Sequence, residues 1–409
     1  MKTILGLATY PITLPRHGGQ RRIAAFAEYY RSIGVNYRAA CVYDPGSYGP
    51  GLVGPDDLPL SYIDGTRGDT PFIGDLQAGE FAASSPAAYR HFRALVERLQ
   101  PDAVQLEQPF MWPLVERLKR DGVLNGVRVI YSSQNWEAPL KADILDRAGL
   151  PEAVSASIAS EIEALEGEVC ANSAAIIAVS AGDAAIYAQL VGPEKPVTLI
   201  PNGVSRRPAI DEQARQRVSV FGARAPLVFV GSAYPPNIDG FLNLVARDGL
   251  FFVPPEKVFA IAGGAAGGIV GSEAYGRFRA ANAERAVAFP DISDMDLFAL
   301  QAISRGTILP IQFGGGSNLK TAEALVQGKW VVATPQALRS FERFRDAPGV
   351  LVADDARQFR LAMRHALNEP HPVLTEAEVA QRDALYWDGA FKNSAFHPFD
   401  EAGPQANLA

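Results

Sequence analysis

The chain has 409 residues, of which 48% are hydrophobic and 20% are charged. This balance is typical of a globular protein, and the length predicts two or three domains with ample cores. The 38 basic and 45 acidic side chains give a formal net charge of −7. That charge argues against a nucleic-acid-binding protein, because no general positive field attracts phosphates. No apolar run approaches the roughly 20 residues that span a bilayer.

The two cysteines, Cys41 and Cys170, lie far apart in the sequence. Their separation predicts reduced thiols and no disulfide framework or metal cluster. The sequence opens directly on a predicted strand, without the apolar core and small-residue cleavage site of a signal peptide. These features together predict a cytoplasmic protein.

Short apolar strands alternate with helical segments along the first half, a pattern typical of parallel sheets covered on both faces. The predicted strands are Thr3–Ala8, Tyr37–Tyr43, Ala103–Leu106, Arg128–Ser132, Ala175–Val179 and Val197–Ile200. The predicted helices are Gln20–Ile33, Pro86–Leu99, Met111–Asp121 and Pro151–Asn172. The segment Tyr43–Gly79, rich in Gly, Pro and Asp, is predicted to be a long functional loop.

The second half repeats this alternation. Its predicted strands are Leu227–Val230, Val258–Ala262, Ala286–Phe289, Thr307–Pro310, Trp330–Ala333 and Val350–Val352. Its predicted helices are Ile238–Ala246, Ala274–Asn282, Asp294–Ala302, Asn318–Gln327 and Ala356–Leu367. We therefore predict an α/β fold with two doubly wound Rossmann-like domains, residues 1–205 and 206–380, which face a central cleft. The tail, residues 381–409, is expected to cross back to the first domain as a helix.

The most informative segment is Pro310–Thr334, in which three glycines precede a predicted helix and a buried strand. The glycines, Gly314–Gly316, allow a backbone to approach a ligand closely, and Ser317 and Asn318 are residues that often begin helices. The start of such a helix favours a bound phosphate. By themselves, however, the glycines favour an ordinary structural turn before an amphipathic helix.

Charged residues on the same predicted helix strengthen the phosphate interpretation. Lys320 lies in the first turn and adds a full positive charge, and Glu323 follows on the same face, where its carboxylate can accept hydrogen bonds from ribose hydroxyls. In contrast, Asp294 and Asp296 have metal-binding spacing but lie at a predicted helix start. We interpret them as helix-capping residues, because acids are favoured there.

Two turns in the first half also carry polar residues after predicted strands. Gly18 and Gly19 precede a helix and repeat the phosphate-loop pattern. His17 beside them is a candidate general base, although a histidine in a loop is more often simply solvated. The second turn, Ser132–Ala138, follows the strand that ends at Ser132.

The segment Pro310–Thr334 resembles the donor-binding signature of family-four, group 1 glycosyltransferases, which have the GT-B fold. The matching residues are Glu323-Ala324, Gly328-Lys329 and Val331–Thr334. Further motifs follow in the family's order: the Gly-Gly turn, a strand that ends in Val-Ser, the sequence Pro-Asn-Gly-Val at 201–204, and the Pro-Asn loop within Val228–Gly240. The resemblance spans the chain from Gly18 to Trp387.

The resemblance implies a role for each matching residue. The reacting centre would include Gly18, Gly19, Gln134 and Lys320. The donor site would include Asn202, Gly203, Gly231, Ser232, Asn237, Gly263, Gly264, Gly315, Gly316, Ser317, Asn318, Leu319, Thr321 and Glu323. The acceptor side would include His17, Asn135 and Glu137.

The sequence departs from the family pattern at four points. Gly315 stands where many members carry an earlier Glu, and Gln134 stands where members often carry a His that contacts the donor sugar. A glutamine can form hydrogen bonds but cannot carry a proton at neutral pH. No Arg or Lys lies between Gly231 and Gly240, so the charge for a pyrophosphate must come from Lys320, with Arg206 or Arg207 as further candidates. Asp291 replaces a usual glycine.

The resemblance implies a retaining hexosyltransferase that moves a sugar from a UDP- or GDP-type donor to a glycan or lipid-linked hydroxyl acceptor. No metal or other cofactor is expected, because Lys320 and a helix start supply positive charge. The expected setting is surface polysaccharide or glycoconjugate synthesis in the cytoplasm, with peripheral contact at the inner membrane. Two alternatives remain: a GT-B nucleotide-sugar epimerase, and a non-catalytic GT-B scaffold or partner protein.

Overall fold

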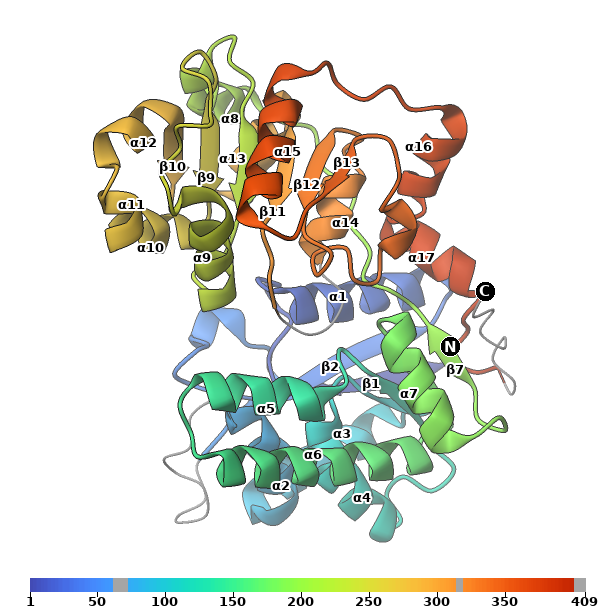
Figure 1. The fold of residues 1–409 in the computed structure, drawn as a ribbon. Coiled ribbons are helices and arrows are strands. Elements are labelled where there is room, and N and C mark those ends of the chain that lie inside the picture. Colours follow the sequence, from blue (N-terminus) through green and yellow to red (C-terminus); the bar gives the residue numbers. More distant parts are fainter. Residues whose placement is uncertain (62–72, 314–318, 401–409) are drawn as a thin grey trace. The chain divides into compact units, whose positions relative to one another are not determined.

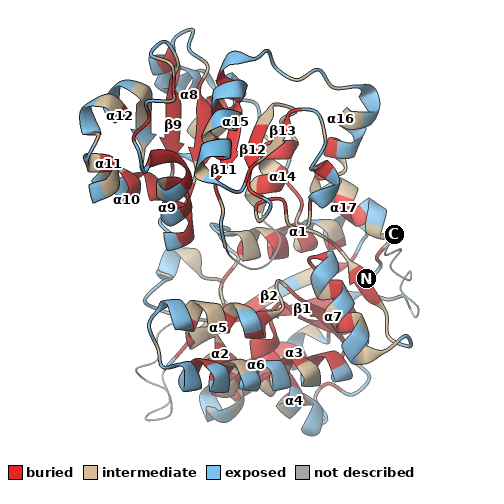
Figure 2. Ribbon diagram, in the orientation of Figure 1, coloured by how far each residue is buried: buried red, intermediate tan, exposed pale blue. Residues whose placement is uncertain are grey.

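The structure is a computed structural model, and it describes residues 1–61, 73–313 and 319–400. The described residues divide into two compact units: unit 1 holds 1–201 and 390–400, and unit 2 holds 202–313 and 319–389 (Figure 1). Each unit is built around one parallel sheet with helices on both faces, which confirms the predicted α/β class. Figure 2 shows that the strands are buried and that the helices expose one side.

Unit 1 contains a seven-stranded sheet with the order β3-β2-β1-β4-β5-β6-β7. The strands are β1 Thr3–Ala8, β2 Asn36–Tyr43, β3 Leu58–Pro59, β4 Ala103–Leu106, β5 Arg128–Ser132, β6 Ala175–Ala178 and β7 Val197–Leu199. The helices are α1 Gly18–Ser32, α2 Gly74–Ser84, α3 Pro86–Leu99, α4 Trp112–Arg120, α5 Glu137–Arg147, α6 Glu152–Asn172 and α7 Ala181–Val191, with short 3-10 turns η1 Pro50–Leu52 and η2 Pro109–Met111. The strand order reverses between β1 and β4, which is where ligands bind in sheets of this kind.

Unit 2 contains a six-stranded sheet with the order β10-β9-β8-β11-β12-β13. The strands are β8 Leu227–Val230, β9 Phe259–Ala262, β10 Ala286–Phe289, β11 Gly306–Leu309, β12 Trp330–Ala333 and β13 Val350–Val352. The helices are α8 Glu212–Arg217, α9 Pro235–Phe241, α10 Ala265–Gly271, α11 Glu273–Gly276, α12 Arg279–Arg285, α13 Asp294–Ile303, α14 Leu319–Leu325, α15 Ala356–Asn368 and α16 Glu376–Asp383, with short turns η3 Ser219–Phe221, η4 Leu242–Ala246 and η5 Glu342–Phe344. The order reverses between β8 and β11.

Alternate residues of a strand pack into two separate apolar cores. In β8, Leu227 and Phe229 join the apolar cluster that includes Phe359 of α15, whereas Val228 joins the cluster that includes Leu300 of α13. This alternation is the packing expected of a parallel strand that is buried on both faces. It explains why the strands of both halves appear in the sequence as continuous apolar runs.

The predicted loop Tyr43–Gly79 is partly wrong, because α2 begins at Gly74 and β3 pairs with β2. Its last residues form a helix because Leu76, Ala78 and Phe81 enter the core of unit 1. Gly79 made this helix hard to predict from the sequence, but a glycine is needed there for packing. A Cβ at Gly79 would lie 2.0 Å from the carbonyl oxygen of Phe110. Residues 62–72 of the predicted loop lie outside the described residues.

Two predicted helices of unit 2 also differ from the structure. The helix predicted at Ala274–Asn282 is two short helices, α11 and α12, and the one predicted at Ile238–Ala246 begins at Pro235 and ends in the π-type turn η4. The break between α11 and α12 follows Gly276, which is a poor helix former.

The described part of the predicted tail, residues 381–400, contains the last three residues of α16 and one further helix. After α16 the chain pairs Tyr386 with Val204, and α17 then runs from Trp387 to Ser394. The first residues of α17 belong to unit 2 and the last to unit 1, where Phe391 stacks on Tyr29 with 4.2 Å between ring centroids. Residues 401–409 of the predicted crossing segment lie outside the described residues.

The Gly-Lys pair after α14 has a structural function. Gly328 adopts a φ of 65°, a conformation that favours glycine at a helix end. Lys329 Nζ then donates to the carbonyl oxygens of Gln301, Ala302 and Ser304 at 2.6–2.8 Å. The lysine therefore caps the C-terminal end of α13 and ties it to the start of β12.

Candidate functional site

Three predicted site residues, Lys320, Asn237 and Ser232, meet at the strand-order reversal of unit 2. Lys320 of α14 donates from Nζ to Asn237 Oδ1 at 2.7 Å. Asn237 of α9 in turn donates from Nδ2 to the backbone oxygen and to Oγ of Ser232, each at 3.1 Å. Ser232 follows β8 directly, so three segments far apart in sequence deliver one connected polar cluster.

The cluster presents a partly desolvated cation. Burial lowers the pKa of Lys320 to about 8, and the nearby Glu323 carboxylate opposes that shift. Lys320 therefore keeps its proton at neutral pH but has lost part of its hydration. A bound anion would be attracted more strongly to such a cation than to a fully hydrated surface lysine. The cluster therefore favours an anionic ligand.

The glycines beside this cluster allow two strand ends to approach closely. Gly231 follows β8, and Gly263 follows β9 with a φ of 86°. A Cβ at Gly263 would lie 2.5 Å from the carbonyl oxygen of Gly231, whereas one at Gly264 would lie 3.1 Å from the nitrogen of Ala233. The backbone therefore needs glycine at position 263 whatever binds there. The predicted contacts of Gly231, Gly263 and Gly264 with a donor stay predictions.

Other predicted donor residues have structural partners within unit 2. Thr321 is fully buried and its hydroxyl donates to the carbonyl oxygen of Ala337. Gly203 lies against Trp387, because a Cβ there would meet the Trp387 nitrogen at 2.9 Å. Asn202 and Leu319 are half-buried. Gly315, Gly316, Ser317 and Asn318 lie outside the described residues, so the predicted glycine loop stays a prediction.

The two arginines considered as further phosphate ligands are held by other groups. Arg206 pairs with Asp388 at 3.0 Å, and its guanidinium lies 4.4 Å from the ring centroid of Tyr386. Arg207 packs on the ring of Phe298; burial lowers its pKa, and the charge of Glu323 opposes that shift. Lys320 is therefore the cation best placed at the strand-order reversal of unit 2.

In unit 1, the turn after β1 brings Tyr10 to the predicted residue Gln134 in the turn after β5. The Tyr10 hydroxyl donates to Gln134 Oε1 at 2.6 Å. A Cβ at Gly19 would lie 2.1 Å from Tyr10 Oη and 2.3 Å from Gln134 Oε1, so only glycine leaves room for this pair. Gly18 differs, because a Cβ there would meet no atom within 4 Å.

His17 immediately precedes α1 and is exposed. Its Nε2 lies 3.2 Å from the Tyr48 hydroxyl, and its ring meets Tyr10 edge-on with 4.6 Å between centroids. Partial desolvation and the charge of Arg21 lower its pKa. A neutral imidazole beside Tyr10 can accept a hydrogen bond or a proton, as an acceptor-side base must.

Asn135 and Glu137 start the segment that leads into α5. Asn135 Nδ2 donates to Glu137 Oε1 at 3.2 Å. Burial raises the pKa of Glu137 to about 7, and the charge of Lys141 opposes the shift. Behind them, the buried Glu166 accepts from the Glu137 backbone nitrogen at 2.9 Å and from the hydroxyls of Tyr131 and Tyr187 at 2.9 and 3.1 Å.

Sequence reasoning missed the polar residues that follow β4. Glu107 is fully buried and accepts from Tyr37 Oη and Gln105 Nε2, both at 2.7 Å. Burial raises its pKa to about 7. The next residue, Gln108, accepts from the Thr9 nitrogen at 3.2 Å and so ties β4 to the turn after β1. The available signal was a Glu-Gln pair directly after a buried strand.

Asp294 and Asp296 lie in the first turn of α13, so the predicted helix start is confirmed, but the capping residue is Ser293 and not either aspartate. Ser293 Oγ accepts from the Asp296 nitrogen at 3.1 Å, and Asp296 pairs with Arg217 at 2.6 Å. Within residues 1–61, 73–313 and 319–400, no group of three or more His, Cys, Asp or Glu side chains is arranged to hold a metal ion. Among the same residues, no helix combines the length and apolar character that crossing a membrane requires.

Comparisons with known proteins agree with this architecture. Residues 17–203 match the glycosyl transferase 4-like domain. The sucrose-phosphate synthase of Thermosynechococcus elongatus superposes with a TM-score of 0.68 at 15% identity, over 97% of this chain and 98% of that one. Anabaena HepE, in complex with UDP and glucose, gives a TM-score of 0.57 at 13% identity, over 96% of both chains. No curated protein matches the chain in sequence.

A third solved structure, WaaG, is a glycosyltransferase involved in lipopolysaccharide biosynthesis. It gives a TM-score of 0.56 at 12% identity, over 97% of this chain and 96% of that one. The two parallel sheets and the full-length superpositions define the GT-B fold. With the glycosyl transferase 4-like domain matched over residues 17–203, they support the resemblance to group 1 glycosyltransferases that the motifs indicated.

Proposed function

We propose that this glycosyltransferase moves a hexose from a nucleotide-sugar donor to a hydroxyl group of a glycan or lipid-linked acceptor, with retention of configuration at the transferred carbon. The observation that carries the proposal is the cluster of Lys320, Asn237 and Ser232 at the strand-order reversal of unit 2. A leaving nucleoside diphosphate develops negative charge, and a positioned, partly desolvated lysine stabilises it.

The comparison with HepE supports the donor class, because that protein was crystallised with UDP and glucose. A UDP- or GDP-type donor would bind unit 2 with its diphosphate near Lys320 and its ribose near Glu323. The proposed setting is surface polysaccharide or glycoconjugate synthesis in the cytoplasm. WaaG, which has the same fold, acts in lipopolysaccharide biosynthesis, and a lipid-linked acceptor would require peripheral membrane contact.

In the proposed reaction, the bond between the anomeric carbon and the diphosphate oxygen breaks, and the acceptor oxygen bonds to the same face of that carbon. The acceptor proton passes to the leaving phosphate, so no enzyme carboxylate acts as nucleophile. Lys320 balances the diphosphate charge in place of a metal ion. Gln134, whose Oε1 accepts from the Tyr10 hydroxyl, would form a hydrogen bond to a sugar hydroxyl in this proposal.

The test is donor binding to the full chain, measured by calorimetry with UDP, GDP and their hexose conjugates. We expect Lys320→Ala to weaken binding about 30-fold, as for the loss of a hydrogen bond to a charged group. The matched control is Lys257→Ala, which removes an equal charge from the same unit outside the cluster. Binding that is equal in Lys320→Ala and wild type would overturn the assigned site. Loss of transfer after treatment with a chelator would overturn metal independence.

A second candidate, a non-catalytic GT-B scaffold, has one observation in its favour. Gln134 occupies the position of the family's histidine, and its Oε1 already accepts from Tyr10. The same residue argues against an epimerase, which needs a group that exchanges protons near the sugar. Transfer of labelled sugar to an acceptor would exclude the scaffold. Donor binding without any transfer or hydrolysis would favour it.

A further inference from the structure

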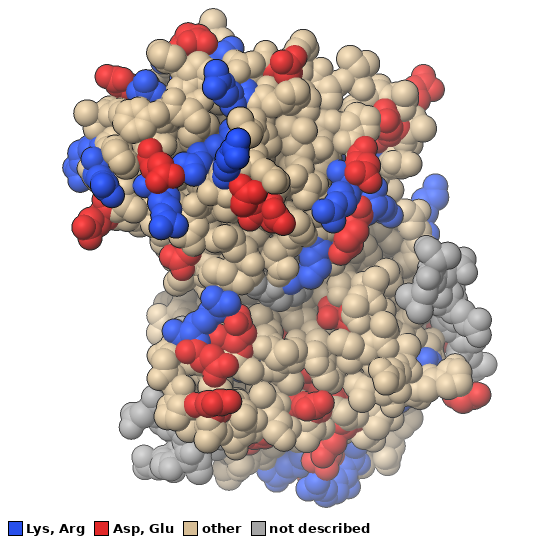
Figure 3. Space-filling model, viewed as in Figure 1, with Lys and Arg blue, Asp and Glu red and all other residues tan. Residues whose placement is uncertain are grey.

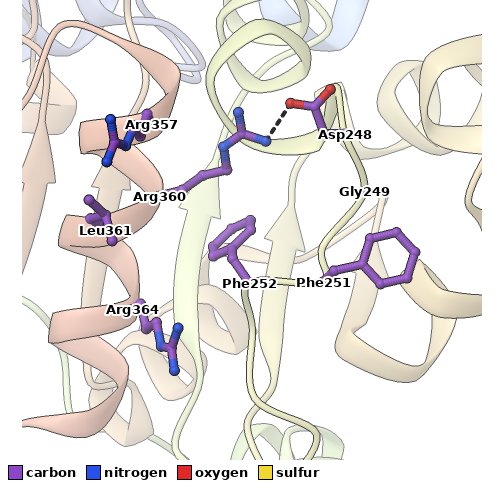
Figure 4. Close-up of a pocket in the computed structure, with 8 residues that line it drawn as sticks. All are labelled: Asp248, Gly249, Phe251, Phe252, Arg357, Arg360, Leu361 and Arg364. Carbon is purple, nitrogen blue, oxygen red and sulfur yellow. Dashed lines mark hydrogen bonds and ion pairs between the residues drawn. The ribbon is translucent and has the colours of Figure 1, made fainter.

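A hollow in unit 2 lies between α15 and the segment that follows η4 (Figure 4). It encloses about 310 Å³ and is lined by Asp248, Gly249, Phe251, Phe252, Arg357, Arg360, Leu361 and Arg364. We call it the α15 hollow. Its lining includes none of the predicted donor residues, and the proposed transfer reaction does not use it.

The α15 hollow carries an excess of positive charge. Arg357, Arg360 and Arg364 lie at i, i+3 and i+7 on one face of α15, which spreads three guanidinium groups along roughly 10 Å of helix. Arg360 reaches across the hollow and pairs with Asp248 at 2.8 Å (Figure 4). Among the described residues, no carboxylate lies within ion-pair distance of Arg357 or Arg364. The lining of the α15 hollow therefore contains three cationic side chains and one anionic side chain.

The single ion pair in the hollow is weak enough to be displaced. The Asp248 side chain is 64% exposed, and solvent screens such a pair strongly. Arg360 is held more firmly, because its Nε donates to the Ala356 carbonyl oxygen at 2.9 Å and only 19% of its side chain is exposed. The guanidinium of Arg360 is therefore already held in position. Asp248, its present partner, is exposed to solvent and can be replaced by another anion.

Apolar side chains border the arginines. Phe251 and Leu361 are 58% and 56% exposed, unusually high for large apolar residues. Phe252 lies across from Arg360, and Phe251 stands further out (Figure 4). Phe251 is held in place by an edge-on contact with Phe278 at 5.4 Å and by Arg285, 6.0 Å from its ring. Figure 3 shows basic side chains over this part of unit 2, with acidic ones among them.

We propose that the α15 hollow is a binding site for a phosphate ester that carries an apolar ring or chain. Several guanidinium forks in one row match phosphate oxygens better than they match a single carboxylate. The apolar part of the ligand would lie on Phe252 and Leu361, and the phosphate would replace Asp248 as the partner of Arg360. A soluble phosphorylated metabolite and a phospholipid headgroup share this chemistry.

The test uses phenyl phosphate and the full chain, in calorimetric titrations. We expect the double variant Arg357→Gln/Arg364→Gln to bind it at least about tenfold more weakly than wild type does. Leu361→Ser should weaken it less. Lys320→Ala should leave it unchanged, which separates this site from the donor site. The matched control is Arg224→Gln/Arg343→Gln, which removes two exposed charges of unit 2 outside the hollow.

Unchanged binding in the double variant, or no binding at all, would overturn the proposal. Equal affinities for inorganic phosphate and phenyl phosphate would also overturn it, since the apolar wall would then contribute nothing. Flotation with phosphatidylglycerol vesicles identifies the source of the phosphate. Vesicle binding that the double variant loses would identify a lipid headgroup. Phenyl phosphate binding without vesicle binding would identify a soluble ester.

Discussion

The two strand-order reversals have the same topology but opposite chemistry. In unit 2, the reversal between β8 and β11 presents a lysine held by an amide. In unit 1, the reversal between β1 and β4 presents a buried carboxyl, Glu107, beside tyrosine and glutamine side chains. Burial raises the pKa of Glu107 to about 7 and lowers that of Lys320 to about 8. The backbone pattern is therefore shared, whereas the residues that follow the strands differ: a buried carboxyl in unit 1 and a lysine in unit 2.

The largest expected effect tests the buried carboxyls of unit 1. Glu166 caps α5 from outside, because its Oε2 accepts from the Glu137 nitrogen, while its Oε1 accepts from Tyr131 and Tyr187. Glu166→Ala would leave these donors unsatisfied in the core, so we expect the free energy of unfolding of unit 1 to fall by about 3 kcal/mol. Glu166→Gln keeps an acceptor oxygen and should lose less. Urea unfolding, followed separately for each unit, measures both.

The pH dependence of the free energy of unfolding gives a second test of Glu166. Burial, with the charge of Glu137 adding to it, raises the pKa of Glu166 to about 8 in the folded chain. An ionisable group with a raised folded pKa contributes stability below its unfolded pKa and loses it as the pH rises. The wild type should therefore lose stability between about pH 5 and pH 8. Glu166→Gln should flatten that loss, and an equal slope in both proteins would contradict the assignment.

An effect of intermediate size on catalysis is expected to distinguish substitutions at the adjacent glycines Gly18 and Gly19. Gly19→Ala places a Cβ against both Tyr10 and Gln134, whereas Gly18→Ala meets nothing within 4 Å. The displaced atoms are ends of flexible side chains, so the fold should survive while their hydrogen bond opens. We expect Gly19→Ala to lower kcat for sugar transfer about tenfold, because small displacements at a reacting centre slow catalysis. Gly18→Ala should change kcat little, and equal losses in both would contradict this reading.

The smallest effect concerns unit 2 alone. Because burial lowers the pKa of Lys320 to about 8, about half of the free lysine is deprotonated near that pH and most of it above. A bound diphosphate favours the protonated form, so nucleoside diphosphate affinity should fall gradually above about pH 8, with proton uptake on binding. Lys320→Arg keeps its charge at these pH values and should remove the dependence. Titrations in buffers of different ionisation enthalpy measure the proton uptake.

The sequence predicted those features that depend on residues close together in the chain. The strands appear as apolar runs, and Ser232, Asn237 and Lys320 were predicted from motifs that the fold then brings into contact. Residues that act across long sequence distances were missed. Glu166 lies 29 residues from the backbone nitrogen that it caps, and Tyr10 lies 124 residues from Gln134. Neither has a neighbouring pattern that distinguishes it from a solvated acid or an ordinary aromatic residue.

The path of α17 has a practical consequence for dividing the protein. Phe391 stacks on Tyr29 and meets Phe26 edge-on at 5.0 Å, so unit 1 is completed by residues that follow all of unit 2 in the sequence. A fragment that ends at residue 201 would expose both rings of α1 to water. An autonomous version of unit 1 would need residues 390–400 joined back to it, by a linker or by circular permutation.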